Sequence, residues 1–89
     1  MTKIPSAPSA KPPIPREGEF AYMNVGYGAT SYDEGDEIIG LQDGRLLTET
    51  FDRQGLGWDG QRWSFNSGLG LATYVVALSE VPEAERAGW

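Results

Sequence analysis

Apolar and polar residues alternate with a period of two along much of this chain, which is the pattern of β-strands rather than of helices. Residues 20–27 alternate with a period of two and carry apolar side chains on both faces, which predicts a strand. Residues 45–52 give the clearest alternation and predict a strand with one solvent-exposed face. Residues 37–41 predict a short return strand, and residues 28–36, with their glycines and clustered acids, predict a loop between strands.

Residues 57–75 hold two of the three tryptophans and predict two or three further short strands. Within this stretch the dipeptide Asp59-Gly60 and residues 66–68 tolerate positive φ, so each marks a turn. The dipeptide can also be the two-residue turn of a hairpin that pairs its flanks, from Trp58 to Trp63. Five or six short strands in so small a domain predict a closed barrel, because closure removes exposed sheet edges. The aromatic residues assigned to its core are Trp63, Phe51 and Phe65.

Residues 1–19 contain all but one of the six prolines and little bulky apolar surface, so this segment is expected to extend as an arm outside the core. Four of these prolines form two pairs, Pro5 with Pro8 and Pro12 with Pro15. Members of each pair are three residues apart, which places them on one edge of a polyproline II helix. The arm is therefore predicted to be either an extended ligand or a flexible spacer.

The pattern changes again after Leu78, at the end of the predicted barrel (residues 20–78). In residues 79–89, Ser79 suits a cap, Pro82 suits the first turn of a helix, and Gly88 ends it, which predicts one or two helical turns. Trp89 is expected either to pack back onto the barrel or to dock into a partner.

Composition narrows the possible functions. The 89-residue chain carries a net charge of −6 and has neither histidine nor cysteine. The negative charge disfavours direct nucleic-acid binding, and the missing residue types remove the commonest general base and the thiolate metal ligands. The acids between Asp33 and Glu37 lack the spacing of a calcium loop, so we predict no metal and no cofactor. No membrane span or signal peptide is evident, which predicts a cytoplasmic protein, with incorporation into a virion as an extension of that expectation.

The order of these motifs resembles that of a Src-homology-3 (SH3-like) domain over about residues 22–78. Asp36-Glu37-Ile38 is similar to the D-E-L of that family, Gly57-Trp58 to its G-W, and residues 68–75 to its closing G-x-F-P-x-N-Y-V. The resemblance implies a small barrel with an aromatic groove for a polyproline helix. The positions that match the groove are Tyr27, Asp36, Glu37, Trp58 and Tyr74. The chain departs from the family pattern at Asp59, Gly70, Leu71 and Thr73.

We expect from this sequence a non-enzymatic module for protein–protein interaction. Its arm, its acidic loop, Trp58 and Trp89 would dock onto protein subunits of a larger assembly. A weak similarity to small phage virion proteins, with W-D-G hairpins and extended arms, indicates a phage virion or a bacterial complex. The alternative is an acidic inhibitor that occupies a basic groove of a host protein, whose binding would weaken as salt rises. An enzyme would have to use Glu37 with Asp36 or Asp59, the one acid/base pair that the chain offers.

Overall fold

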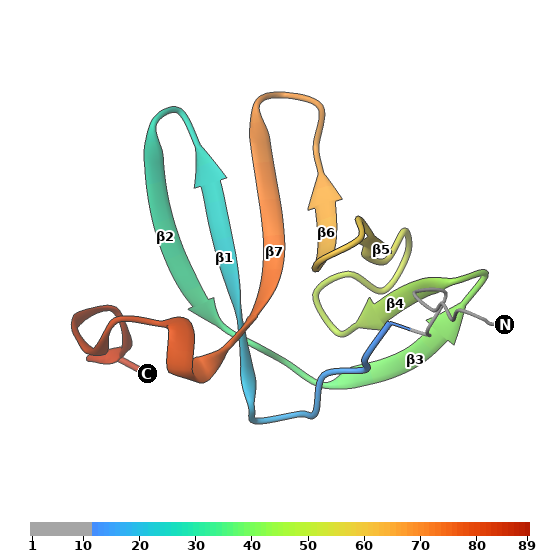
Figure 1. Ribbon diagram of the computed structural model, residues 1–89, viewed down its shortest axis with the longest axis horizontal. Coiled ribbons are helices and arrows are strands. Elements are labelled where there is room, and N and C mark those ends of the chain that lie inside the picture. The colour runs from blue at the N-terminus through green and yellow to red at the C-terminus, as the bar shows by residue number, and fades with distance from the viewer. Residues whose placement is uncertain (1–11) are drawn as a thin grey trace, which may run out of the picture.

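The computed structural model describes residues 12–89, and within them the regular elements are β-strands and two short 3-10 turns (Figure 1). The strands are β1 (Phe20–Gly26), β2 (Ala29–Glu34), β3 (Ile38–Gln42), β4 (Arg45–Thr48), β5 (Gly57–Trp58), β6 (Trp63–Asn66) and β7 (Leu71–Ala77), followed by the turns η1 (Leu78–Glu80) and η2 (Glu83–Arg86). The expectation of a mostly β domain is confirmed. The described residues contain seven strands, more than the five or six predicted, and the expected C-terminal helical turns take the 3-10 form.

The strands form two antiparallel sheets that do not close into a barrel. One sheet has the order β2-β1-β7-β6-β5, and the other pairs β3 with β4. Two backbone hydrogen bonds of 2.8 Å, exchanged between Leu46 and Leu56, join them. The predicted closed barrel is therefore not found. A continuous ladder stops at this bridge because Gly55, with φ of 72°, bends the chain out of strand conformation immediately before Leu56.

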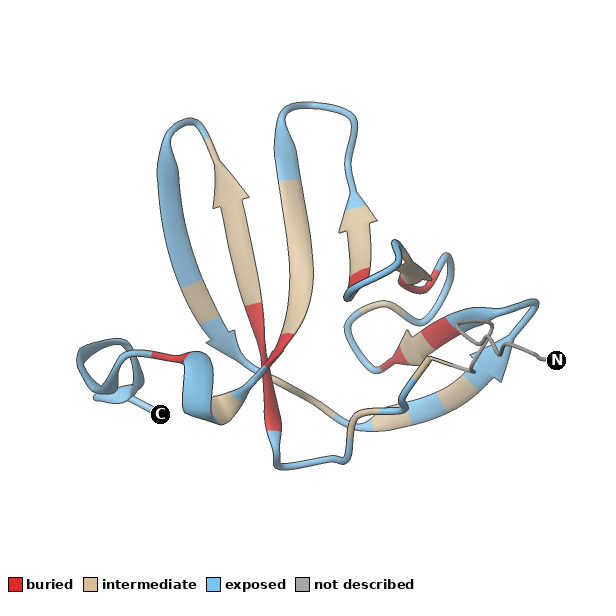
Figure 2. Ribbon diagram, viewed as in Figure 1, coloured by how far each residue is buried: buried red, intermediate tan, exposed pale blue. Residues whose placement is uncertain are grey.

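The five-stranded sheet carries a buried cluster on each face, and the strand predicted over residues 20–27 is present as β1. One face holds the larger core, formed by Phe20, Tyr22, Leu46, Leu56 and Trp63. Phe51 and Phe65 pack against this core, as expected. The opposite face holds a smaller cluster of Ala21, Val76 and Val81. Figure 2 shows buried residues on the lower parts of β1 and β7, on β4, at the start of β6, just before β5 and after η1, so the upper part of the hairpins stands clear of the core.

Two hairpins use the same tight turn. Tyr27-Gly28 joins β1 to β2, and Asp43-Gly44 joins β3 to β4, with positive φ at all four residues. Positive φ at both central positions defines a type I′ turn, whose twist matches that of the flanking strands. The predicted turn at Asp43-Gly44 is confirmed. The prediction of a loop over residues 28–36 is wrong for most of its length, because β2 occupies it and pairs with β1.

Two other boundaries differ from the sequence prediction. β4 ends at Thr48, whereas the alternation predicted a strand to residue 52, because the chain turns there and the Phe51 N–H donates to Thr48 Oγ1. In the hairpin of β5 and β6, Trp58 pairs with Trp63 across a four-residue loop instead of a two-residue turn. The Asp59 carboxylate accepts the backbone N–H groups of the loop residues Gln61 and Arg62, at 2.8 and 2.7 Å, and so stabilises this longer loop.

Candidate functional site

A groove of about 520 Å³ lies between the proline segment at residues 13–16 and the aromatic pair of the β5–β6 hairpin. The N-terminal segment forms one wall of the groove. The β5–β6 hairpin and the last residues of β7 form the other wall. Its lining residues are Pro13, Ile14, Pro15, Arg16, Glu19, Phe20, Trp58, Gln61, Arg62, Trp63, Val75, Val76, Ala77 and Glu80. We call it the tryptophan groove.

Trp63 forms the base of the tryptophan groove. It is 3% exposed, and its indole Nε1–H donates a hydrogen bond of 2.8 Å to the Pro13 carbonyl oxygen. A buried indole needs such an acceptor, and here the N-terminal segment supplies it. Trp58 packs edge-to-face on Trp63, with ring centroids 5.5 Å apart, and stays half-buried. The proline segment is thus fixed to the sheet by one specific contact beside an accessible aromatic surface.

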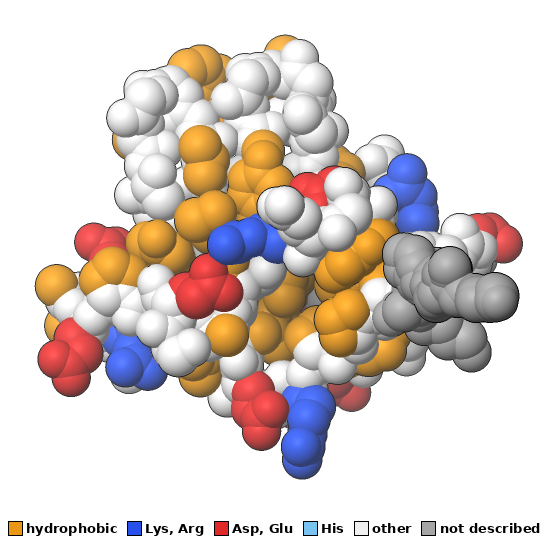
Figure 3. All heavy atoms as spheres, in the orientation of Figure 1, with side chains coloured by type: hydrophobic (Ala, Val, Ile, Leu, Met, Phe, Trp, Pro, Cys, Tyr) orange, Lys and Arg blue, Asp and Glu red, His pale blue; other side chains and the backbone are white. Residues whose placement is uncertain are grey.

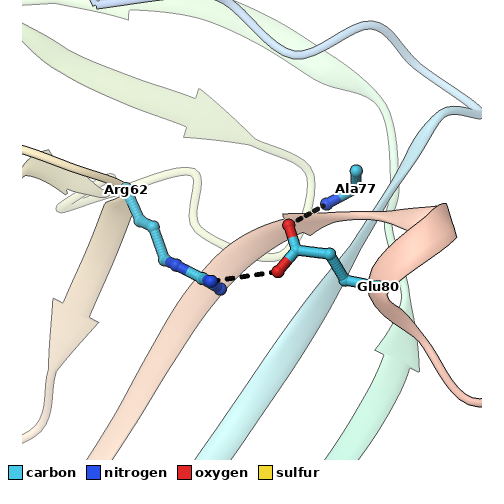
Figure 4. Close-up of polar contacts among 3 residues, drawn as sticks. All are labelled: Arg62, Ala77 and Glu80. Carbon is cyan, nitrogen blue, oxygen red and sulfur yellow. Dashed lines mark hydrogen bonds and ion pairs between the residues drawn. The ribbon is translucent and has the colours of Figure 1, made fainter.

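The rim of the tryptophan groove is charged. Arg62 Nη2 lies 2.9 Å from Glu80 Oε1, and the other carboxylate oxygen of Glu80 accepts the Ala77 N–H (Figure 4). This pair ties the β5–β6 loop to η1. Arg62 Nη1 is buried and has no hydrogen-bond partner among the described residues. The backbone N–H groups of Arg62 and Gln61 also lower the pKa of Asp59, which favours the charged carboxylate in the hairpin loop.

Only part of the predicted site comes together in this groove. Trp58 and Pro15 line it, and Pro12, which precedes the lining residue Pro13 in sequence, is half-buried. Pro5 and Pro8 lie outside the described residues. Sequence reasoning missed the roles of Pro13 and Arg62. The three-residue spacing of the prolines picks out Pro12 and Pro15 but not Pro13. The one signal for Pro13 is that a core tryptophan needs an acceptor for its N–H.

The other predicted aromatics lie elsewhere. Tyr27 occupies the turn at the far end of β1 and is 82% exposed. Tyr74 packs against the smaller cluster on the opposite sheet face from Val75. Trp89 is 42% exposed and lines a separate hollow of about 430 Å³ together with Gly35 and Leu78. The groove set implied by the Src-homology-3 resemblance is therefore not assembled, because its aromatic members Tyr27, Tyr74 and Trp58 lie on three different parts of the protein.

Asp36, another predicted groove residue, connects the two sheets. Its carboxylate accepts hydrogen bonds from the Tyr22 hydroxyl and from both the backbone N–H and the hydroxyl of Thr50. Burial raises the pKa of Asp36, but these hydrogen bonds outweigh it and the net pKa is lowered. Burial and the Asp36 carboxylate raise the pKa of the Tyr22 phenol, which stays protonated as a donor. Glu37, by contrast, is exposed, and its carbonyl accepts the Glu49 N–H at 2.9 Å.

Replacing Asp36 with alanine is expected to lower the free energy of unfolding at pH 7 by about 1.5 kcal/mol, because three donors lose a charged acceptor at a partly exposed position. The native pKa of Asp36 is below its unfolded value, so its stabilisation is present above about pH 4 and is lost as pH falls through the native pKa. Urea titrations between neutral and acidic pH should show the two proteins converging at low pH. A constant difference across that range would contradict this role of the charge.

Two of the carboxylates that the sequence offers for acid/base chemistry already accept hydrogen bonds. Within residues 12–89 no group of three or more acidic side chains is placed to hold a metal ion. Asp36 is committed to its hydrogen bonds, and Asp59 to those of the hairpin loop. Over the same residues, no helix has the length and apolar character needed to cross a membrane. Comparison with protein-family models, curated proteins and solved structures finds no match for this chain.

Proposed function

We propose that this protein is a non-enzymatic interaction module that docks onto a larger assembly through its N-terminal arm and the tryptophan groove. The observation that carries the proposal is the hydrogen bond from Trp63 Nε1 to the Pro13 carbonyl beside the half-buried ring of Trp58. It supports a surface suited to extended, proline-containing chains. Subunits of a phage virion or of a bacterial complex, the class indicated by the sequence, remain the proposed partners.

The chemistry of the groove supports recognition of an extended backbone. A polyproline segment has no internal hydrogen bonds, so its carbonyls are available, and aromatic rings pack well on its apolar ridges. In this chain Pro13 supplies such a carbonyl, and Pro15 and Ile14 supply apolar surface at the groove wall. Pro13 is anchored there, and we propose that a partner that binds residues 1–11 also contacts Trp58. Arm and groove therefore act as one composite surface.

We also propose a kinship with SH3-like small barrels, although the sheets are open. It rests on the order of the sequence motifs and on an aromatic groove that contacts a proline segment. Fold kinship would not itself assign a function, because the groove residues of that family are dispersed here. The proposal of an interaction module does not depend on this kinship and rests on the tryptophan groove.

The test is affinity capture from a lysate of the source organism or its phage, with tagged full-length protein and two variants. One variant lacks residues 1–11 and keeps Pro13. The other is Trp58→Ala, and Ile39→Ala, on exposed surface of β3, is the control. We expect full-length protein and the control to retain the same partner, and both variants to bind it at least about tenfold more weakly. Circular dichroism should show all four folded. Equal retention of the partner by both variants would refute the composite surface.

The acidic inhibitor remains the second candidate, favoured by the net charge of −6. Its contact with a basic groove would be electrostatic, so its affinity should fall steeply as ionic strength rises. Binding through Trp58 and the proline segment should change little with salt. A titration of the captured partner at low and high salt therefore distinguishes the two functions.

A further inference from the structure

One end of the five-stranded sheet carries no charged side chains. Residues 23–32 and 63–79 contain no Asp, Glu, Lys or Arg, in a chain that is otherwise rich in acids. Antiparallel pairing of β1 with β7 brings these two ranges side by side, with Gly26 opposite Leu71. Figure 1 shows both hairpin turns at the same end of the sheet, and on the face seen in Figure 3 that end forms an upper lobe without charged side chains.

The end of this lobe exposes large apolar side chains. Tyr27 is 82% exposed, Leu69 is 71% exposed and Leu71 is 39% exposed. We call these three residues, with the turns that carry them, the uncharged tip. Beside it lies a shallow hollow of about 320 Å³, lined by Gly26, Ala29, Leu71 and their neighbours on β1, β2 and β7. The uncharged tip therefore presents a protruding aromatic ring next to a depression formed largely by small residues.

Tyr27 is an unfavourable choice for its backbone position. It has φ of 54° in a type I′ turn, a position that prefers asparagine, aspartate or glycine and disfavours bulky residues. The other turn of this type has Asp43 at the equivalent place, with φ of 53°. An exposed aromatic ring at a strained position contributes little to the fold. This favours a role in contact with another molecule.

We propose that two copies of this chain associate through the uncharged tip, with Tyr27 as the central anchor. The second copy is the occupant because this one surface offers both halves of a contact, the exposed ring of Tyr27 and the hollow beside it. Two molecules of net charge −6 repel one another wherever acidic surfaces meet, and the uncharged tip lets them approach with the acids held apart. A strongly basic partner would find no charge to pair with at this surface. Because ring and hollow belong to one surface, two-fold symmetry seats each Tyr27 against its partner's hollow.

This interface lies at the opposite end of β7 from the tryptophan groove, whose lining includes Val75 and Ala77. Self-association is thus separable from the proposed docking onto other subunits. A dimer would present two arms and two grooves to an assembly, which raises avidity without any new contact to the partner.

Sedimentation equilibrium of the full chain, from about 10 µM to about 1 mM, tests the proposal. We expect a monomer–dimer equilibrium that strengthens as salt rises from about 0.1 M to about 1 M, because screening weakens the repulsion between the acidic bodies. Tyr27→Asn should reduce the association constant at least about tenfold, since it removes the anchor. Asparagine suits the turn, so this variant should melt no lower than the original protein.

Leu69→Ser is the second variant and should also weaken association. Leu41→Ser is the matched control, because Leu41 is an exposed leucine (55%) on the other sheet, and it should leave association unchanged. A chain that stays monomeric throughout the concentration range would overturn the proposal. So would a folded Tyr27→Asn protein that associates as strongly as the original, or a loss of equal size in Leu41→Ser.

Discussion

Replacing Trp63 with alanine is expected to lower the free energy of unfolding by about 3 to 5 kcal/mol, which would leave little or no folded protein at room temperature. Trp63 is 3% exposed and lies in the larger core with Phe20, Leu46 and Leu56. Alanine would leave a cavity at the centre of that core, and it would also free the Pro13 carbonyl from its only specific tie to the sheet among the described residues. Far-ultraviolet circular dichroism with urea titration measures the effect.

Two further variants separate the contributions of Trp63. Trp63→Phe keeps an aromatic ring in the core but loses the Nε1 donor, so it should cost about 1 to 3 kcal/mol. Trp58→Ala removes the half-buried neighbour of Trp63 and should lower stability less than Trp63→Ala does. If Trp63→Ala melted within a few degrees of the original protein, the larger core would not depend on this residue, and its position in the fold would have to be reassigned.

The parts of the fold that sequence predicted correctly depend on local signals. The apolar residues on both faces of residues 20–27 indicated β1, which is covered on both sides because Phe20 and Ala21 point into different clusters. Asp43-Gly44 is a strong type I′ signal, and the turn is there. Trp63 was assigned to the core by its size and position alone, and it is buried.

The failures have physical causes that lie outside any short window of sequence. Gly28 and the acids of residues 28–36 predict a loop because they are turn formers, yet residues 29–34 pair with β1. The turn itself is made by a tyrosine that a turn rule would not choose. A closed barrel needs β4 and β5 to pair along their length, and the positive φ of Gly55 interrupts the extended chain just before Leu56, where the pairing is a single bridge.

The candidate site was harder to predict than the fold. Trp58 and Pro15 do line the tryptophan groove, but the Pro13 carbonyl is a backbone group that any residue could supply, so no motif marks it. Asp36 was assigned to a binding groove on the basis of a family pattern. Its neighbours Tyr22 and Thr50 are distant in sequence, and only the packing of the two sheets shows that its hydrogen bonds hold the fold together.

The junction of the two sheets leads to the second large expected effect, which is that Gly55→Ala lowers the free energy of unfolding by about 2 to 5 kcal/mol. Gly55 has φ of 72°, where an alanine is strained. A Cβ there would also lie 2.9 Å from the Leu46 carbonyl oxygen and 2.8 Å from Leu47 Cδ2. That carbonyl accepts the Leu56 N–H, so relief of the clash requires a shift of the bridge between the sheets.

Gly44→Ala provides the matched control. Gly44 has φ of 78°, nearly the same backbone strain, but an added Cβ would meet no atom within 4 Å. Gly44→Ala should therefore lower the free energy of unfolding only by the strain of placing alanine at positive φ, about 1 to 2 kcal/mol. For a domain of this size each kcal/mol lowers the melting temperature by about 4 to 8 °C, so a difference between the two variants is readily measured. Equal melting temperatures would show that the Leu46–Leu56 bridge tolerates the extra atom, and that the two sheets are joined by side-chain packing rather than by this close approach of backbone.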